Sequence, residues 1–416
     1  MAARDRDPTR VHVGGRSVGK FVGGHFGDDG GALSGASQPA ASALPRASAP
    51  AHAGGLSPPR ILVDSAEFRA ALAADVQAAR SRVYVQAMTF EGDSAGQELT
   101  ELLLASSCPD RRLLVDDYSR FKVSDRFVHT PWGYRDRALK QELNEMHRAV
   151  ERLRVAGVRV LFTNPMGRIP FRIPSRNHKK LAMLDDVCYL GGINFSDHNF
   201  AWHDMMLRLD DPALADFLAM DVDATCRGVD QRAVKRLPGV EVHLLDGRTN
   251  ERGYAPILAL IDRAEQSIFM ESPYVTYPFL DRLVDAGHRG VAVTLVQPRD
   301  NNYPAVAAYV AQKASRSDIE LRLLPGMIHL KAIVIDDRVL VMGSSNFDVV
   351  SYRAEQEIVV LVTDRRVIDE FTRRVIDPDL EASTPALGEH SHWRSCLCAL
   401  QLRAVEVWAC SVRARG

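Results

Sequence analysis

One pattern constrains this chain more than any other: His-x-Lys-x(4)-Asp occurs twice, once in each half. The first copy consists of His178, Lys180 and Asp185, and the second of His329, Lys331 and Asp336. Each copy is followed by a short turn that contains Gly and ends in Asn, at Asn194 and Asn346. The separation of the copies is that of whole domains, much longer than the period of a solenoid repeat. We therefore expect two duplicated domains that are related by an approximate two-fold axis.

Hydrophobic periodicity around the motifs indicates the fold class. In the first half we expect helices at 65–80, 95–106 and 136–156, alternating with strands at 83–88, 112–116 and 158–162. In the second half we expect helices at 254–266 and 278–288, and strands at 267–270, 291–296 and 321–324. Helices that alternate with short apolar strands are typical of layered sheets. The pattern therefore predicts an α/β fold in each half.

Composition divides the chain into four parts. Residues 1–58 are rich in Gly, Ala, Ser and Pro, which predicts a disordered low-complexity tail. We expect a first domain with the first motif over 59–232, and a second domain with the second motif over 233–383. The pattern breaks at 384–416, whose structure stays open, with an unpacked tail as the simplest interpretation. The His and Cys spacing in this last part fits no common zinc module.

Overall composition excludes several classes of protein. The chain has 416 residues, of which 46% are hydrophobic and 25% charged, as expected for a globular protein. A formal net charge of -1 provides no general attraction to nucleic acid or anionic lipid. No apolar run is long enough to cross a bilayer, and the charged N-terminus argues against a secretory signal. We expect a cytoplasmic protein whose contact with the inner face of the membrane is peripheral at most.

The motif residues have the chemistry of phosphodiester cleavage. On a strand, His178 and Lys180 point to the same face, as do His329 and Lys331, because side chains alternate with a period of two. In-line displacement needs a nucleophile on one side of phosphorus and an acid on the other, which two opposed imidazoles can supply. One would form a covalent phosphohistidine, and the other would protonate the leaving alcohol and then deprotonate the incoming water or alcohol. The pattern alone assigns neither role to a particular histidine.

Further polar residues are expected to complete this site. The side chains expected to bind the non-bridging phosphate oxygens are Lys180, Lys331, Asn194, Asn346 and Ser344. An acid also begins an apolar strand after each motif, Asp204 after the first and Glu357 after the second. Each acid could accept the Nδ1–H of the histidine in its own half and fix its tautomer, or simply face solvent. The sequence shows no carboxylate cluster of the metal-binding kind, so we expect no metal and no cofactor.

At these residues the chain resembles the phospholipase D superfamily, and within it the bacterial cardiolipin synthase group. The matching segments are Arg176–Lys180, Gly191–Asn194, Trp202–Asp204, Ser272–Tyr274 and Gly343–Asp348. The similarity covers about 60–380 of the chain. It implies two αβα-sandwich domains related by a pseudo-two-fold axis, with one shared active site at their interface and a phosphatidyl substrate. It also implies that His178 is the nucleophile and His329 the acid and base, and the family motif includes Asp185 and Asp336 among the catalytic residues.

Three functions stay open from the sequence. The first is transfer or hydrolysis of phospholipids, the expected partners; Met183, Tyr274, Tyr277 and Phe279 would then contact acyl chains or merely form core. The insertion 121–134 is either a membrane-contacting lid or a loop. The second is nucleic-acid cleavage along the Arg-rich run 168–176, although the near-neutral charge leads us to expect no nucleic acid partner. The third, a catalytically silent binding protein, is disfavoured by two intact motifs. The pattern indicates no oligomeric state.

Overall fold

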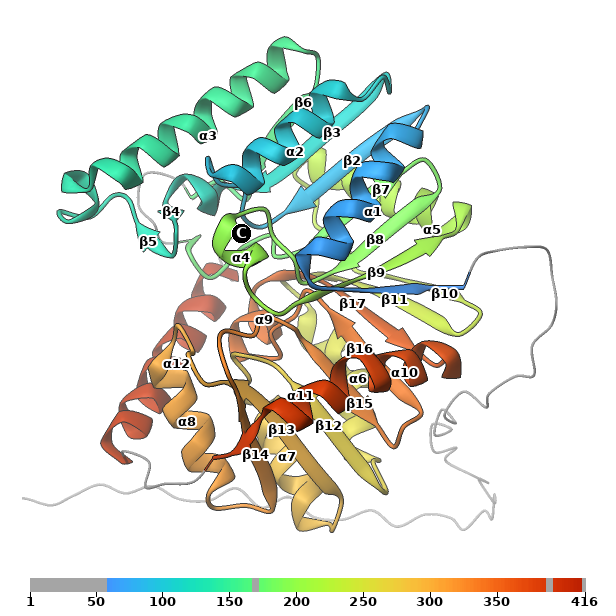
Figure 1. Cartoon of the computed structure of the whole chain (residues 1–416). Helices are drawn as coiled ribbons and strands as arrows, with labels where there is room; N and C mark the ends of the chain where they lie inside the picture. The colour runs from blue at the N-terminus through green and yellow to red at the C-terminus, as the bar shows by residue number, and fades with distance from the viewer. Residues whose placement is uncertain (1–57, 167–171, 387–391, 414–416) are drawn as a thin grey trace, which may run out of the picture. The chain divides into compact units, whose positions relative to one another are not determined.

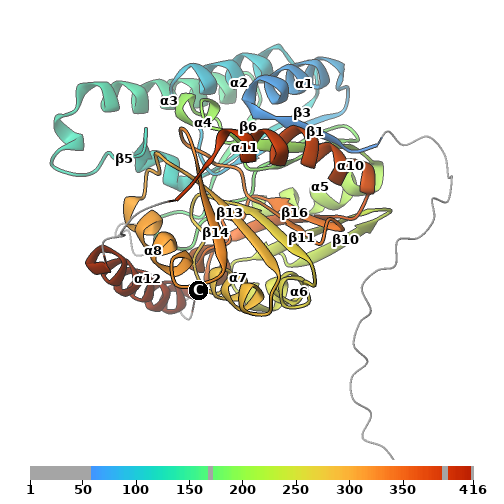
Figure 2. The ribbon, with the colours of Figure 1, turned by 60° about the horizontal axis from the view of Figure 1, so that its bottom comes forward.

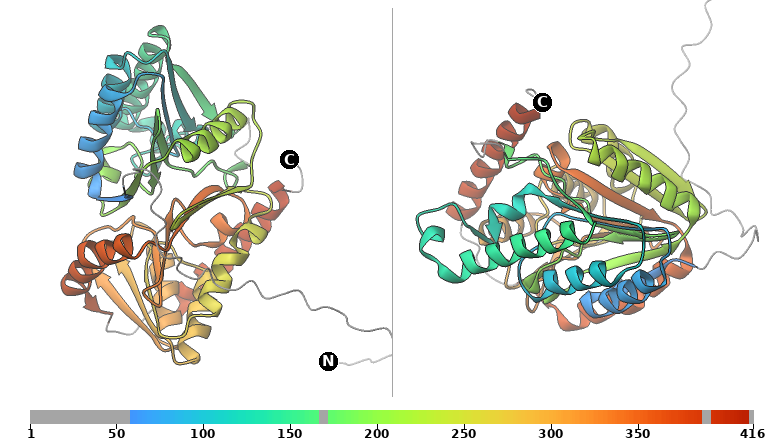
Figure 3. Two further views of the ribbon diagram at one scale, coloured as in Figure 1. Left: turned by 90° about the vertical axis from the view of Figure 1, so that its right-hand side faces the viewer. Right: turned by 90° about the horizontal axis from the view of Figure 1, so that it is seen from above.

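The structure, a computed structural model, describes residues 58–166, 172–386 and 392–413, all of which lie in one compact unit, His52–Gly416. The tail expected at 1–58 lies outside the described residues, except for its last residue. The described chain forms two large mixed sheets and a two-stranded hairpin (Figure 1). Helices cover both faces of each large sheet (Figure 3). This arrangement confirms the α/β class.

The first sheet has seven strands in the order β1-β9-β8-β7-β2-β3-β6. They are β1 (Arg60–Val63), β2 (Arg82–Ala87), β3 (Asp110–Asp116), β6 (Arg159–Thr163), β7 (Leu181–Leu184), β8 (Val187–Gly191) and β9 (Met205–Asp210). β2, β3 and β6 run parallel, whereas β7, β8 and β9 form an antiparallel meander that joins the sheet at β2. One face is covered by α1 (Asp64–Ala78), α2 (Ser94–Ala105) and α3 (Arg137–Val155), and the other by α5 (Pro212–Cys226) (Figures 1 and 3).

The second sheet has nine strands in the order β10-β11-β17-β16-β15-β12-β13-β14-β18. They are β10 (Ala233–Leu237), β11 (Val240–Asp246), β12 (Ser267–Glu271), β13 (Ala292–Pro298), β14 (Ile319–Leu324), β15 (Ala332–Ile335), β16 (Val339–Gly343), β17 (Gln356–Val362) and β18 (Thr384–Pro385). Its outer face carries α6 (Asn250–Asp262), α7 (Phe279–His288) and α8 (Pro304–Ala314) (Figure 2). Its inner face carries α10 (Arg365–Phe371), a π-helical turn (Thr372–Ile376) and α11 (Asp377–Ala382).

The two sheets repeat one strand order. In the first sheet β9-β8-β7-β2-β3-β6 are neighbours, and in the second β17-β16-β15-β12-β13-β14 are neighbours with the same relative directions. The register agrees as well, because Gln86 pairs with Leu181 at the start of β7, and Glu271 pairs with Ala332 at the start of β15. The duplication is therefore confirmed. The boundary at 232/233 stays a prediction, and the last helix of the first half ends at Cys226, ahead of β10.

Side-chain alternation along the central strands separates two kinds of core. Val83 and Val85 on β2 pack toward α1, α2 and α3, whereas the intervening Tyr84 belongs to a core on the opposite face. That opposite core combines residues of both sheets with α5 and α10, for example Leu218 and Phe371. The two motif strands, β7 and β15, both contribute to it. The inner faces of the two sheets thus share one apolar core, which places the ends of both motif strands in the same interior.

The C-terminal segment is packed, which corrects the interpretation of 384–416 as an unpacked tail. β18 pairs with β14, and α12 (His392–Arg413) lies beside α8 (Figure 2). Glu406 on α12 accepts hydrogen bonds from Tyr277 Oη at 3.0 Å and from Arg353 at 2.6 Å. Cys398 is buried in the outer core of the second sheet. The helix forms because these contacts bury one of its faces, although its sequence periodicity is weak.

The remaining elements are short, and several border the site. They are the 3-10 turns η1 (Asp117–Arg120) and η2 (Gly133–Arg135), the hairpin of β4 (Lys122–Val123) and β5 (Arg126–Phe127), and the helices α4 (Asp197–Phe200) and α9 (Val349–Arg353). The insertion at 121–134 contains this hairpin and exposes the side chains of Phe127 and Trp132. Among the described residues, no helix has the length and apolar character needed to cross a membrane.

Candidate active site

The two motif segments each run beside a strand of the opposite half. Ahead of β7, the backbone N–H of His178 donates to the carbonyl of Gln356 on β17 at 2.9 Å. Ahead of β15, the backbone N–H of His329 donates to the carbonyl of His203, just before β9, at 2.7 Å. Each motif histidine is therefore held next to the acid that begins the other half's last central strand.

The orienting acids are exchanged between the halves, which corrects the expected pairing. His178 Nδ1 lies 3.0 Å from Glu357 Oε1, and His329 Nδ1 lies 2.7 Å from Asp204 Oδ2. Asp204 and Glu357 do orient the histidines, but each orients the histidine of the other half. A carboxylate that accepts the Nδ1–H leaves Nε2 as the free ring nitrogen for chemistry. The four residues are all buried, so these contacts are not weakened by solvent.

Ser344 supports Glu357. Its hydroxyl donates to Glu357 Oε2, and Ser351 Oγ donates to Glu357 Oε1 at 2.7 Å. The equivalent place in the first half is Gly192, where an added Cβ would lie 2.3 Å from Asp204 Oδ1. The turn after the first motif therefore needs glycine so that Asp204 can approach His329. The hydroxyl hydrogen of Ser344 is directed at Glu357, so phosphate binding by Ser344 stays a prediction.

The motif lysines lie beside the carbonyl groups of their own histidines. Lys180 Nζ donates to the His178 carbonyl at 2.8 Å, and Lys331 Nζ donates to the His329 carbonyl. Burial lowers the pKa of Lys180 to about 8 and that of Lys331 to about 7, while Glu357 and Asp204 oppose this shift. Both ammonium groups thus sit in the interior with few competing partners, which suits a bound anion.

Burial also determines the charge state of the histidines. It lowers the pKa of His178 to about 4 against the opposing effect of Glu357, and it lowers the pKa of His329 well below its usual value. Burial raises the pKa of Asp204 to about 6, while Lys331 acts in the opposite direction. For Glu357, burial favours a raised pKa, but His178, Lys180 and Ser344 together outweigh burial and hold the pKa below its usual value. At neutral pH both imidazoles are therefore neutral, each beside a carboxylate.

The motif aspartates lie at the far ends of the motif strands. Asp185 accepts hydrogen bonds from the backbone N–H groups of Arg80 at 2.7 Å and Ser81 at 2.9 Å, at the start of β2. Asp336 accepts from the backbone of Gln266 at 2.7 Å and Ser267 at 3.0 Å, at the start of β12. A whole strand separates each from its lysine. The structure does not bring these two acids to the histidines, which corrects their expected place among the catalytic residues.

The two asparagines differ in their partners. Asn194 Oδ1 accepts from the Thr89 backbone N–H at 3.2 Å, and Asn194 Nδ2 donates to Asn199 at 3.4 Å. Asn346 Oδ1 is buried and has no hydrogen-bond partner among the described residues. Asn194 is thus tied into the turn, whereas the amide of Asn346 has an unfilled hydrogen-bonding site.

Two aromatic rings flank His329, but only one of the four apolar residues named from the sequence, Tyr274, is among them. The rings of Trp202 and Tyr274 lie 5.4 Å and 6.3 Å from the His329 ring, measured between centroids. Met183 and Phe279 belong to the apolar cores of the two sheets, so they are not at the site. Tyr277 contacts the C-terminal helix instead.

Two buried charged side chains near His178 are not part of the His-x-Lys-x(4)-Asp pattern, so the pattern does not predict their roles. Glu355 lies 3.9 Å from His178 Nδ1, and burial raises its pKa well above the usual value. Arg176 is buried in an ion pair with Asp116 at 2.9 Å. The alternation of Glu355 and Glu357 at the start of an apolar strand is the one sequence signal that could have indicated a pair of acids here.

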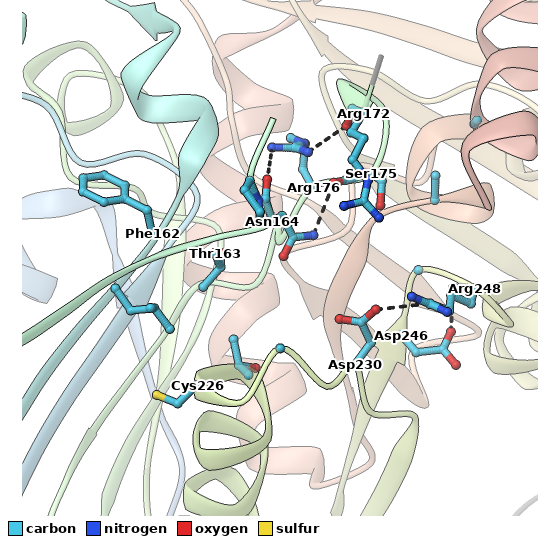
Figure 4. Close-up of a pocket in the computed structure, with 17 residues that line it drawn as sticks. Phe162, Thr163, Asn164, Arg172, Ser175, Arg176, Cys226, Asp230, Asp246 and Arg248 are labelled. Carbon is cyan, nitrogen blue, oxygen red and sulfur yellow. Dashed lines mark hydrogen bonds and ion pairs between the residues drawn. The ribbon is translucent and has the colours of Figure 1, made fainter. Parts of the chain in front are cut away.

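A cavity of about 240 Å³ lies beside the segment that leads to His178 (Figure 4). Ser175 and Arg176 line it, but the motif histidines do not. Two of its arginines are paired, Arg248 with Asp230 at 3.3 Å and Arg176 with Asp116 at 2.9 Å. Residues 167–171 lie outside the described residues. In the described part of the run 168–176, the Arg176 side chain is therefore already engaged within the fold.

The structure assembles acidic groups that the sequence does not reveal. Among the described residues, three sets of His, Asp and Glu side chains have ligand atoms within 4.8 Å of one another. They are His178 with Glu355 and Glu357, His203 with Glu271 and Asp379, and Glu91 with Asp93 and Glu142. The expectation that no carboxylate cluster occurs is therefore wrong. In the first set, Glu357 already has a role, because it accepts a hydrogen bond from His178 Nδ1 and orients that ring.

Comparison with known proteins agrees with this geometry. Residues 257–376, which include the second motif, match the family model described as "Cardiolipin synthase, PLD-like domain". This part of the chain is thus similar to the phospholipase D-like domain of cardiolipin synthases, as the resemblance in sequence predicts. The first half carries the other copy of the motif on the same strand order.

Curated cardiolipin synthases and one solved structure are similar to more than half of the chain. It is 26% identical to the minor cardiolipin synthase ClsB of Bacillus subtilis, over 56% of this chain and 64% of that protein. It is 23% identical to cardiolipin synthase A of Salmonella paratyphi A, over 73% of this chain and 65% of the relative. The chain thus spans a little less than two thirds of these relatives. The phosphatidylserine synthase of Haemophilus influenzae has the same fold, with a TM-score of 0.61 and 15% identity over 85% of this chain and 94% of that one.

Proposed function

We propose that this protein is a phosphodiester-cleaving and phosphatidyl-transferring enzyme that acts on phospholipids through a covalent phosphohistidine. The observation that carries the proposal is the pair of exchanged dyads, His178 with Glu357 and His329 with Asp204. Each dyad presents one free imidazole nitrogen, and the two come from opposite sheets. This is the arrangement that in-line displacement requires.

In the first step, His178 Nε2 attacks phosphorus and the bond to the leaving alcohol breaks. His329 donates the proton that this alcohol takes up. In the second step, His329 accepts a proton from water or an acceptor alcohol, whose oxygen displaces His178 from phosphorus. An imidazole with a lowered pKa is a ready nucleophile, and the anionic substrate raises the pKa of the second imidazole so that it can carry the proton.

Lys180 and Lys331 neutralise the non-bridging oxygens as charge develops on them in the transition state. The amides of Asn194 and Asn346 are proposed to add to this set, Asn346 more directly because its amide is less engaged within the fold. Asp185 and Asp336 act on the fold, since they fix the starts of β2 and β12 and thereby the strands next to the motifs.

Phospholipid is the substrate class that we infer from the relatives named as cardiolipin synthases. A peripheral contact with the inner face of the membrane suits the exposed rings of Phe127, Trp132 and Tyr134 in the insertion around β5. Aromatic side chains of this kind settle at the boundary between lipid and water. The insertion is therefore our candidate for the part that touches the membrane.

The test is turnover of phosphatidylglycerol liposomes by the full chain, with phosphatidic acid and cardiolipin measured as products. We expect turnover in the unchanged protein and its loss in His178→Ala and His329→Ala, while His288→Ala, an exposed histidine, retains it. Protein quenched in alkaline denaturant, in which the P–N bond survives, should carry substrate phosphorus only when His178 is present. Single-stranded DNA is the competing substrate: its cleavage without lipid turnover contradicts the substrate, and activity in both histidine variants contradicts the mechanism.

A further inference from the structure

A second group of titratable side chains lies beside the His329 and Asp204 pair, where elements of both halves meet. It consists of His203 ahead of β9, Glu271 at the end of β12, and Asp379 on α11. Their ligand atoms, one from each side chain, lie within 4.8 Å of one another. The chemistry proposed above uses none of these three side chains.

Glu271 is the unusual member of this group. Its side chain is fully buried, at 0% exposure, and no described N–H or O–H group donates to either carboxylate oxygen, while the Asp379 carboxylate lies in hydrogen-bonding contact with it. Burial raises the pKa of Glu271 well above its usual value, because an isolated carboxylate is unfavourable there. A buried carboxylate that accepts from no described donor, next to two other ligand atoms, is a position that a cation would satisfy.

His203 is oriented as metal-binding histidines are. Its Nδ1 lies 2.7 Å from Asp64 Oδ1, which leaves Nε2 directed toward Asp379 Oδ2 at 3.2 Å. A carboxylate on one ring nitrogen fixes the tautomer and leaves the other nitrogen as the ligand atom. Asp64 would therefore be the supporting acid, and Nε2 the ligand.

A cavity of about 300 Å³ opens at His203. Its lining includes His203, Asp64, Trp202 and Met327, and it does not include Glu271 or Asp379. The cavity provides a route for an ion from solvent to His203 and room for a water molecule as a further ligand.

We propose that His203, Glu271 and Asp379 bind one divalent metal ion of the zinc type, with water as the fourth ligand. One imidazole nitrogen and two carboxylate oxygens are a ligand set that such ions accept. Against the effect of burial, Asp379 and Asp64 raise the pKa of His203 well above its usual value, so binding of the ion releases the Nε2 proton. Two carboxylates, the resulting neutral imidazole and a doubly charged ion sum to zero charge, which removes the cost of the buried Glu271. Ligand atoms around a tetrahedral ion lie about 3.4 Å apart, so the group needs only a small contraction.

The first half lacks this ligand set at the equivalent place. Gln86 occupies the position in β2 that Glu271 occupies in β12. Gln356 takes the place of His203 in the interstrand bridge to the opposite motif segment, and its amide donates to Asp230. Gln86 donates to Asn177 Oδ1 at 2.8 Å, so neutral amides stand there in place of the acid and the imidazole. The duplicated fold therefore does not itself require Glu271 and His203 at these positions.

The ion would join the two halves next to the active site. His203 belongs to the first half, whereas Glu271 and Asp379 belong to the second. The carbonyl of His203 accepts from the backbone N–H of His329, and the next residue, Asp204, orients the His329 ring. The role we assign to the metal is structural, so the inference stands or fails independently of the proposed reaction.

The experiment uses the full chain after dialysis against a chelator, with Zn²⁺ as the probe. Calorimetric titration should give one ion per chain, and Glu271→Gln or Asp379→Asn should weaken binding at least about tenfold. The control, Asp230→Asn, changes the acid at the equivalent place in the first half and should bind Zn²⁺ unchanged. At saturating Zn²⁺ the unfolding midpoint should rise by roughly 3–6 °C in the unchanged protein and in the control alone.

Glutamine fits the equivalent place in the first half, so Glu271→Gln should fold without metal at least as well as the unchanged protein. X-ray absorption of the zinc-loaded chain provides a readout that needs no variant: nitrogen and oxygen ligands are expected. Sulfur ligands would mean that cysteines bind the ion and would overturn the proposal. So would the absence of binding, which is the result expected if Glu271 is protonated and shares its proton with Asp379. Equal affinity in Glu271→Gln would overturn it too.

Discussion

Replacing Glu357 with Gln tests the exchange of orienting acids most directly. In this fully buried pair, Glu357 Oε1 lies 3.0 Å from His178 Nδ1, so water cannot replace the lost carboxylate. A hydrogen bond to a charged group contributes about 1.5–3 kcal/mol. At about 1.4 kcal/mol per factor of ten, Glu357→Gln should lower kcat about 10- to 150-fold. The amide can also donate to Nδ1, which would move the ring proton to Nε2 and block attack.

The location of the effect is as informative as its size. Side-chain ¹⁵N chemical shifts of the histidines should change at His178 in Glu357→Gln, and at His329 in Asp204→Asn. Glu355→Gln is the matched control, because burial raises the pKa of Glu355 and keeps it neutral 3.9 Å from the same ring. It should change kcat less than about threefold. If Glu357→Gln instead perturbed His329 and spared His178, the exchanged pairing would be refuted.

Three further predictions concern charge, stability and space. The pKa of Lys331 is about 7, so kcat/KM should fall as pH rises above about 7 and the lysine loses its proton. The pKa of His178 is about 4, so kcat/KM should also fall below about pH 4, where the imidazole gains a proton. A flat profile from pH 4 to 9 contradicts this prediction. Asp185→Ala should lower the free energy of unfolding, measured by denaturant titration, by about 1–3 kcal/mol. The folded variant should keep its phosphohistidine labelling within about threefold. Loss of labelling in a stably folded variant would show that Asp185 takes part in the chemistry. Gly192→Ala should lower kcat more than about tenfold, because its Cβ would meet Asp204 Oδ1 at 2.3 Å; unchanged kcat would show that Asp204 can move without consequence.

Much of the fold follows from local pattern. The predicted helix at 136–156 is α3, and the predicted strand at 112–116 is most of β3. Strands β10 and β11 were not predicted, because β10 lies at the sheet edge with alternating charge and carries little apolar signal. The helix α12 was not predicted either, since exposed apolar residues such as Leu400 and Val407 obscure its buried face.

The sequence predicts which residues form the site, but it does not predict which acid pairs with which histidine. Asp204 and Glu357 stand at equivalent places in the repeat, so the sequence identifies both as candidate orienting acids. Sequence distance favours pairing within a half, whereas the actual pairing depends on how two sheets meet through a shared core. Ser344 shows the same limit, because its partner lies 13 residues further on, across a strand pair.

The exchange of acids between the halves has a consequence for how this chain can change. A fragment with the second motif alone would contain His329 and Glu357, yet neither would have its partner. A substitution of an acid in one half alters the reactivity of the histidine in the other, so selection on either half acts on both. A chain with only one motif would need a second copy of itself to complete either pair, whereas this chain carries both partners in one covalent unit.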